Sequence, residues 1–404
     1  MGSRLLLQGD ADCMGCHIHG LHGLGLSDPR QACLQVLERL GLADLHAVVV
    51  AQHLQGPRTS FLSLKLQPDQ ARQWAPGLDT LGLAATLQLD MVGSRQDLAR
   101  EIVVAMLMGP VAFEFPSVDE LVSAVQIRIN IVLAARKTML AFHTMQAERP
   151  QDCWQYDEDR GFVLRPGVSL ITALVKATQP EVSGELYSFS CYRASEYVIL
   201  LGIAQELERC NPALYVQLQS LWGTHPIKSG LFHDVFLHEQ GSMDAPLPAH
   251  YFVPGDRAWF RNPDEASADV PGFEGSWVMY LGGGLFNNFW QRDRPYTLVT
   301  KYLEIYHWRN AVYRDEQGEE CIDEARVARL VQETLHDPLE LERMVAVMGR
   351  YREPRGVYTA AGGHASPLEA APHDELWPGC CTCAEQPALS HLGPETRRVR
   401  QFCE

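Results

Sequence analysis

The spacing of apolar residues along the chain changes at Cys191. Before it, residues 187–190 alternate aromatic and small polar side chains, a period of two that is typical of extended backbone. After it, apolar residues recur at helical spacing. They are Ala194, Tyr197, Val198, Leu201, Ala204 and Leu207. The pattern predicts that Cys191 lies where an extended segment enters a buried helix.

The predicted position of Cys191 has a chemical consequence. A thiol at the start of a helix faces unpaired backbone N–H groups and the positive end of the helix dipole, and both favour the thiolate. Enzymes that use a cysteine nucleophile prepare their attacking atom in this way. A buried core cysteine is the alternative, because free cysteine is among the most buried residue types.

Residues 29–89 predict a small accessory module of mixed helix and strand. Helical spacing covers residues 31–41 and 68–78, whereas residues 47–52, 60–66 and 83–89 read as strands. A module of about sixty residues folds alone only marginally. No residue in it suggests catalytic chemistry.

The middle of the chain predicts helices followed by strands. Residues 94–108 have helical spacing, and Ser117 and Glu120 form the Ser-x-x-Glu pattern of a capping box at the start of a second helix. Residues 253–264 read as a strand between two turns, and residues 273–282 as a second strand that ends in three consecutive glycines. These glycines lack the Gly-Lys-Ser/Thr ending of a phosphate-binding loop, so we interpret them as a turn.

Charge and composition narrow the choice of partners. The chain has 404 residues and a formal net charge of -16, which argues against nucleic acid or an anionic membrane as the main partner. The start of the sequence lacks a secretory signal pattern, and no apolar stretch is long enough to span a bilayer. We therefore expect a cytoplasmic protein whose 11 cysteines are thiols or metal ligands rather than a disulfide framework.

Cysteines near both ends of the chain raise the question of a metal or a haem. Cys13, Cys16 and His17 match the Cys-x-x-Cys-His attachment pattern of c-type haem, but haem is normally attached after export. A second cluster at residues 380–383 could complete a zinc site, although its spacing fits no closed zinc pattern well. A leader with incidental cysteine and histidine is the alternative, and we expect no cofactor and no metal.

Five short motifs recur in the order and at the spacing found in a known family. They are PVAFEF at 110–115, RINIV with AA at 128–135, YSFSC at 187–191, PGD with WFRNP at 254–263, and G with VMYLG at 275–282. Over residues from about 108 to about 288, the chain resembles the small bacterial, spore-coat type of protein-glutamine gamma-glutamyltransferase. The resemblance implies an α+β fold with a papain-like core, related to that of the NlpC/P60 peptidases, in which a helix-start cysteine packs on an antiparallel sheet.

The resemblance also implies an activity and a division of the chain. Members of the family join a glutamine side chain to a lysine amine with release of ammonia, so the implied partners are proteins bearing Gln and Lys, and the nucleophile falls on Cys191. We expect residues 1–93 to form a leader and the accessory module, 94–350 a transglutaminase-like catalytic domain, and 351–404 a flexible tail.

The family's catalytic partners fall on residues of a different kind in this chain. The catalytic glutamate falls on Ser276, a second acidic position on Ser190, and the histidine near Asn287, Asn288 or Phe289. The resemblance alone therefore supplies no general base.

Two nearby residues are candidates for this role. Glu274 lies two positions before Ser276, so on a strand the two side chains share a face. His250 precedes the strand that begins near Val253, and an imidazole is the usual activator of a thiol. A surface glutamate and a packed histidine are the alternatives. We predict a cysteine-dependent acyltransferase of the transglutaminase type. The alternatives are a catalytically silent relative that binds or supports other proteins, and a glutamine deamidase or cysteine peptidase on the same core.

Overall fold

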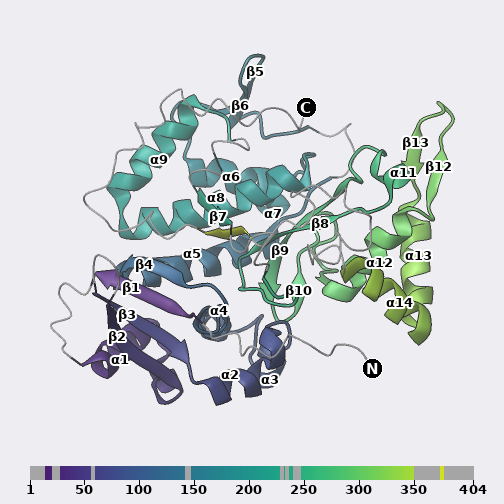
Figure 1. Ribbon diagram of the computed structural model, residues 1–404. Helices are drawn as coiled ribbons and strands as arrows, with labels where there is room; N and C mark the ends of the chain where they lie inside the picture. Colours follow the sequence, from purple (N-terminus) through teal and green to yellow (C-terminus); the bar gives the residue numbers. More distant parts are fainter. Residues whose placement is uncertain are drawn as a thin grey trace.

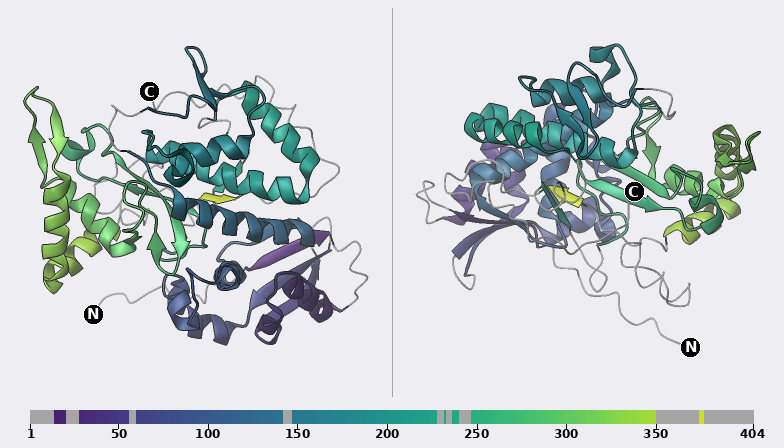
Figure 2. Two further views of the ribbon diagram at one scale, coloured as in Figure 1. Left: turned by 180° about the vertical axis from the view of Figure 1, so that it is seen from behind. Right: turned by 90° about the horizontal axis from the view of Figure 1, so that it is seen from above.

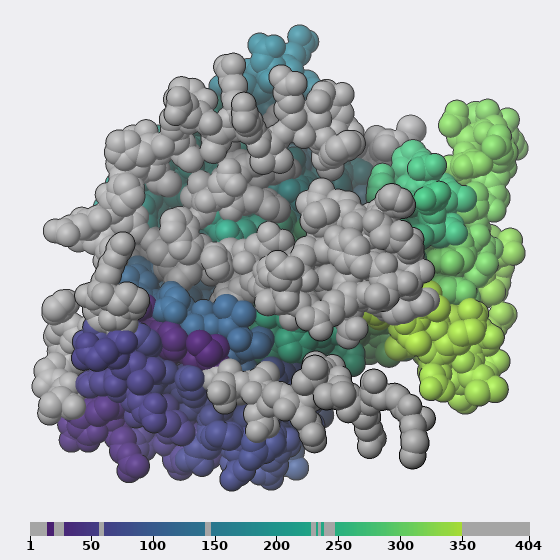
Figure 3. All heavy atoms as spheres, in the orientation of Figure 1, coloured from purple at the N-terminus to yellow at the C-terminus, as the bar shows by residue number. Residues whose placement is uncertain are grey.

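The computed structural model describes residues 14–20, 28–55, 60–141, 147–227, 232, 236–239, 247–349 and 374–376. Within them the chain forms two larger sheets with helices between and around them (Figure 1). The N-terminal sheet and the C-terminal helices lie at opposite ends of the molecule, as the views from behind and from above also show (Figure 2). The same separation is visible on the surface, where purple N-terminal and green C-terminal residues lie far apart (Figure 3).

The N-terminal sheet has four strands in the order β2-β3-β1-β4. β1 pairs antiparallel with β3 and parallel with β4, so a strand that follows the predicted accessory module completes its sheet. The strands are β1 (Cys16–Gly20), β2 (Val49–Gln55), β3 (Ser60–Leu66) and β4 (Phe113–Ser117), and the accompanying helices are α1 (Pro29–Arg39), η1 (Ala43–Ala47), α2 (Pro68–Trp74), η2 (Pro76–Leu78) and α3 (Leu83–Leu87).

A layer of helices connects the two larger sheets. Ser94 and Ser117 cap α4 and α5, each accepting a hydrogen bond from the backbone N–H three residues on. α5 packs closely on α8, since a Cβ atom on Gly202 would lie 2.5 Å from the Ile131 side chain. The helices are α4 (Arg95–Leu107), α5 (Val118–Lys137), α6 (Leu170–Thr178), α7 (Pro180–Ser183), α8 (Cys191–Cys210) and α9 (Pro212–Thr224), with the hairpin β5 (Trp154–Asp157) and β6 (Gly161–Leu164) beside them.

One hydrophobic core runs from the N-terminal sheet through these helices. It includes Ile18 and Leu64 of the sheet, Val104 of α4, Ile131 of α5 and Val198 of α8. The apolar contacts of the N-terminal sheet therefore continue through the central helices to α8, the helix that begins at Cys191.

The second large sheet is antiparallel and has the strand order β11-β10-β9-β8-β14-β7. β14 comes from the C-terminal part of the chain and lies between β8 and β7. The three glycines Gly282–Gly284 all have positive φ and form the predicted turn between β9 and β10. The strands are β7 (Leu237–Glu239), β8 (Arg257–Arg261), β9 (Gly275–Gly282), β10 (Leu285–Phe286), β11 (Tyr296–Thr297) and β14 (Asp374–Leu376), and the short helix α11 (Glu265–Ala268) lies between β8 and β9.

A second hydrophobic core lies between this sheet and the C-terminal helices. Phe260 and Tyr280 of the sheet and Leu303 of α12 belong to it. The elements are α12 (Leu298–Trp308), the hairpin β12 (Val312–Arg314) and β13 (Glu320–Ile322), α13 (Glu324–Leu335) and α14 (Pro338–Gly349).

Several local expectations differ from the structure. Residues 83–89 were expected to form a strand, but they contain the helix α3, which buries Leu83 and Ala84 and ends at the left-handed residue Gln88. The extended residues before Cys191 form no strand ladder. Instead the Tyr187 carbonyl accepts the Ala141 N–H at 3.0 Å.

Cys16 of the haem-like motif is 2 % exposed and belongs to the core under β1, where its side chain packs rather than projecting outward. Cys13 and the cysteines of residues 380–383 lie outside the described residues. Across the part of the chain that the structure describes, no group of three or more His, Cys, Asp or Glu side chains is placed to hold a metal ion. No helix among the described residues is long and apolar enough to cross a bilayer.

Candidate active site

Cys191 is the first residue of α8. Ser190 caps this helix in extended conformation, and its hydroxyl accepts the Arg193 N–H at 3.3 Å. The side chain of the capping residue thus satisfies one free N–H of the first turn, while others remain directed at the helix start. Cys191 itself is half-buried, whereas most of the next turns of α8 are buried.

The second large sheet also affects the pKa of the Cys191 thiol. Burial raises the pKa of the Cys191 thiol, and this effect outweighs several contacts that lower it. The backbone N–H groups of Trp277, on β9, and of Tyr192 and Cys191 act in the opposite direction and lower the pKa of the thiol. The helix start therefore acts on the thiol as the sequence suggested, but burial opposes it more strongly.

The positive charge of Lys301, on α12, also lowers the pKa of the thiol. Its side chain is 2 % exposed, lies 4.1 Å from the Tyr296 ring centre and forms an ion pair with Glu304 at 2.5 Å. A buried ammonium held in this way is fixed in position, so its field acts on Cys191 without a large reorganisation.

Aromatic and cationic groups surround the first turn of α8. The rings of Tyr192 and Trp277 meet edge to face with centres 5.4 Å apart. The guanidinium of Arg257, a fully buried residue of β8, lies 4.2 Å from the centre of a Trp277 ring and 5.3 Å from that of Tyr192. Arg257, Tyr192 and Trp277 thus contact one another, which restrains the Trp277 side chain.

A buried carboxyl lies one turn further along α8. Glu196 is fully buried, and burial raises its pKa to about 7, against the lowering effect of Arg193 and Arg257. Arg193 forms an ion pair with it and also donates to the Ile227 carbonyl at 2.7 Å. The region behind Cys191 therefore carries a group that titrates near neutrality.

A buried ion pair joins two of the motifs that the sequence analysis identified. Arg128 of α5 and Asp256, just before β8, are 1 % and 4 % exposed in their side chains, and Nη1 lies 2.6 Å from Oδ1. The other Asp256 oxygen accepts the Val253 N–H at 2.8 Å. Gly255 has a φ of +94°, and a Cβ atom there would lie 3.2 Å from Arg128, so the Pro-Gly-Asp turn is shaped to fit this arginine.

Glu274 lies one residue before β9 and is exposed. Its carboxylate accepts the Gly272 N–H at 3.3 Å. Ser276, at the position of the family's glutamate, is buried on β9 opposite Phe260.

His250 is also exposed, with 53 % of its side chain accessible. Its Nδ1 atom lies 3.4 Å from Oδ2 of Asp79, in the segment between η2 and α3. Among the described hydrogen bonds and ion pairs, none joins His250 or Glu274 to Cys191. The structure therefore brings Trp277, Lys301 and the first turn of α8 to the thiol, and gives the two candidate bases other neighbours.

The sequence did not predict that Trp277, Lys301 and Arg257 belong to the candidate site. A backbone N–H leaves no sequence signal. Lys301 does leave one, because it falls among Leu298, Tyr302 and Ile305 on the apolar side of a helical segment, where a lysine is buried only when it is paired.

Comparison with known proteins identifies the family. A family model described as protein-glutamine gamma-glutamyltransferase matches residues 83–363, which is more than half of the chain. The chain therefore belongs to the protein-glutamine gamma-glutamyltransferase family, and the resemblance seen in the motifs is confirmed.

A solved structure of a transglutaminase from Geobacillus stearothermophilus, without its C-terminal extension, is similar to the chain. It is 20% identical, the alignment covers 53% of this chain and 98% of that chain, and the TM-score is 0.34. No curated protein sequence matches the chain.

Proposed function

We propose that the protein is a cysteine-dependent acyltransferase of the transglutaminase type, with Cys191 as its nucleophile. Membership of the family supports the class of activity. The observation that carries the assignment of the nucleophile is the position of the thiol at the first residue of α8, where the Trp277 N–H, the helix-start N–H groups and Lys301 all favour its ionised form.

The reaction proceeds in two acyl transfers. The Cys191 thiolate adds to the carbonyl carbon of a glutamine carboxamide, the C–N bond breaks, and the nitrogen takes up one proton and leaves as ammonia. The thioester is then attacked by a lysine amine, which loses one proton as the C–S bond breaks and the thiolate is restored. With water in place of the amine, the same site is a glutamine deamidase.

Backbone N–H groups at the start of α8 and on β9 are suited to hold the oxyanion that forms in each step. The backbone of Trp277 is held by the pairing of β9 with β8, and its ring contacts Tyr192 and Arg257. We retain Glu274 and His250 as the candidate proton acceptors. Both side chains are exposed, and catalytic hydrogen bonds often form only when substrate is bound.

A catalytically silent member of the family is the second candidate. Two observations favour it: Ser276 occupies the family's acidic position, and burial raises the pKa of the Cys191 thiol. Such a protein would keep the fold as a binding or structural module and would leave the thiol unused.

Incorporation of a fluorescent primary amine into a glutamine-rich acceptor protein distinguishes these candidates. We predict incorporation by the wild type and none above background by Cys191→Ala, with little change in thermal stability because Cys191 is only half-buried. Cys210→Ala is the matched control, since Cys210 is the last residue of the same helix and is exposed. Activity that survives in Cys191→Ala would remove Cys191 as nucleophile, and an inactive wild type would favour the silent relative.

A further inference from the structure

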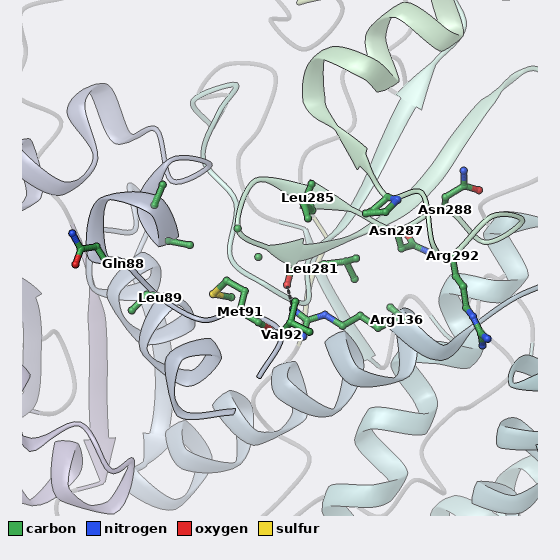
Figure 4. Close-up of a pocket in the computed structure, with 16 residues that line it drawn as sticks. Gln88, Leu89, Met91, Val92, Arg136, Leu281, Leu285, Asn287, Asn288 and Arg292 are labelled. Carbon is green, nitrogen blue, oxygen red and sulfur yellow. Dashed lines mark hydrogen bonds between the residues drawn. The ribbon is translucent and has the colours of Figure 1, made fainter. Parts of the chain in front are cut away.

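A cavity of about 420 Å³ lies between α3, the end of α5 and the turn from β9 to β10 (Figure 4). We call it the Arg136 pocket. Neither Cys191 nor the groups that act on its thiol line the cavity. Its size is that of a site for a small organic molecule.

One asparagine in its wall presents a donor. In Asn288, Oδ1 accepts the N–H groups of Trp290 and Gln291 at 3.1 Å and 3.0 Å, so its acceptor is used on the backbone and its Nδ2 donor is left. The neighbouring Asn287 is 3 % exposed, and its Oδ1 atom accepts the Met279 N–H at 2.6 Å. Its Nδ2 atom is enclosed by protein, so Asn287 shapes the wall without offering a donor to the cavity.

Two arginines give the cavity a positive character. Arg136 donates to the carbonyls of Met91 and Leu281 at 2.7 Å and 3.0 Å and so ties opposite walls together. Burial raises the pKa of Glu101, behind the glycine turn, to about 7, so its carboxyl compensates Arg136 only in part near neutral pH.

Arg292 is the second cation. Its Nη1 atom donates to the Lys137 carbonyl at 3.3 Å, and it forms an ion pair with Glu181, which is itself half exposed. None of the described residues that line the cavity is an aspartate or a glutamate.

The other side of the cavity is apolar. Leu89, Met91 and Val92 lie across it from Asn288 and Arg292, with Leu285 above (Figure 4). Val92 stands at the rim of the cavity and is 88 % exposed. A ligand with an apolar body would shield this side chain from water.

We propose that the Arg136 pocket binds a small organic carboxylate, whose anionic head contacts Asn288 and Arg292 and whose short apolar body lies against Met91, Val92 and Leu285. The described lining of the cavity contains no carboxylate, and the bound anion would compete with Glu181 for Arg292. A charged acceptor forms stronger hydrogen bonds than a neutral one, so such a site selects an anion. Cys191 does not line this cavity, although Asn288 lies near the position of the family's histidine.

Calorimetric titration of the full chain tests the proposal with matched pairs of probes. The acids are hexanoate, 4-phenylbutyrate and N-acetyl-leucine, and each is compared with its own primary amide, which keeps the body and removes the charge. We expect at least one acid to bind at one site per chain, at least about tenfold more tightly than its amide. Equal affinities within every pair, or no saturable binding of any acid up to about 10 mM, would overturn the proposal.

Two variants locate the binding. Asn288→Asp keeps an acceptor for the Trp290 and Gln291 N–H groups but places a negative charge where the donor was, and Arg292→Gln removes a cation, so each should weaken binding of the acid at least about tenfold. Arg314→Gln is the control, because it removes an exposed arginine on β12 that is paired with Glu320 at 2.9 Å. Thermal unfolding shows whether each variant is folded, and Arg292→Gln alone suffices if Asn288→Asp is not. Wild-type affinity in the folded pocket variants would overturn the assignment to this cavity.

Discussion

Among the electrostatic contacts in the structure, the buried ion pair of Arg128 and Asp256 should lower the stability most when one of its partners is neutralised. It holds α5 against the turn before β8, and β8 pairs with β9, which carries the Trp277 N–H. Asp256→Asn keeps the shape of the side chain and an oxygen for the Val253 N–H, but it removes the carboxylate charge that lies against the buried arginine. We therefore expect amine incorporation to fall along with stability.

The magnitude follows from burial. Breaking a buried ion pair by neutralising one partner costs about 3–5 kcal/mol, because the remaining charge stays in a medium that solvates it poorly. An exposed pair contributes only about 0–1 kcal/mol. Arg314 and Glu320 form such a pair at 2.9 Å, with side chains 71% and 42% exposed, so Glu320→Gln is the matched control.

Urea unfolding followed by tryptophan fluorescence and by circular dichroism measures the difference in free energy of unfolding. We predict a loss of about 3–5 kcal/mol for Asp256→Asn and at most about 1 kcal/mol for Glu320→Gln. In a double-mutant cycle with Arg128→Met, the double variant should be far less destabilised than the sum of the two single changes, because the charges compensate one another. An Asp256→Asn variant as stable as the control, or a purely additive cycle, would refute the reasoning.

Two further predictions concern the candidate active site. Burial raises the pKa of the Cys191 thiol, so its thiolate fraction should still be increasing with pH near neutrality. The rate constant for alkylation of Cys191 by iodoacetamide should therefore rise about tenfold per pH unit from pH 7 to pH 8.5. A plateau of this rate constant below pH 7 would contradict the raised pKa. Either Glu274→Gln or His250→Ala, but not both equally, should lower the rate of amine incorporation at least about tenfold without changing stability, and full activity in both variants would exclude them as the proton acceptor.

The sequence correctly predicted elements whose formation depends on residues that are close together in the chain. β3 lies at residues 60–66 as expected, and α5 begins after Ser117 because the serine hydroxyl accepts the Glu120 N–H at 3.2 Å. Residues 83–89 alternate like a strand, yet they form a helix because Leu83 and Ala84 are both buried there by tertiary contacts. A short apolar segment does not distinguish the two structures by its pattern alone.

A part of the candidate site could be predicted from the sequence only where the residues that define it lie in one continuous segment. The change of spacing at Cys191 is local, and α8 begins at that residue. Lys301 and the Trp277 N–H reach the thiol through the packing of α12 and β9, which no short-range pattern encodes. Glu274 and His250 were selected by their distance along the chain from family positions, and the structure gives them Gly272 and Asp79 as neighbours.

Mass spectrometry of the acyl-enzyme tests most directly whether Cys191 is the nucleophile. The full chain is mixed with a blocked glutamine dipeptide in the absence of an amine acceptor, stopped in acid and digested. We predict that the peptide bearing Cys191 gains the mass of the donor minus one ammonia, that a lysine analogue removes this adduct, and that Cys191→Ala forms none. An adduct on another cysteine, or turnover of the dipeptide without any adduct at Cys191, would contradict the assignment.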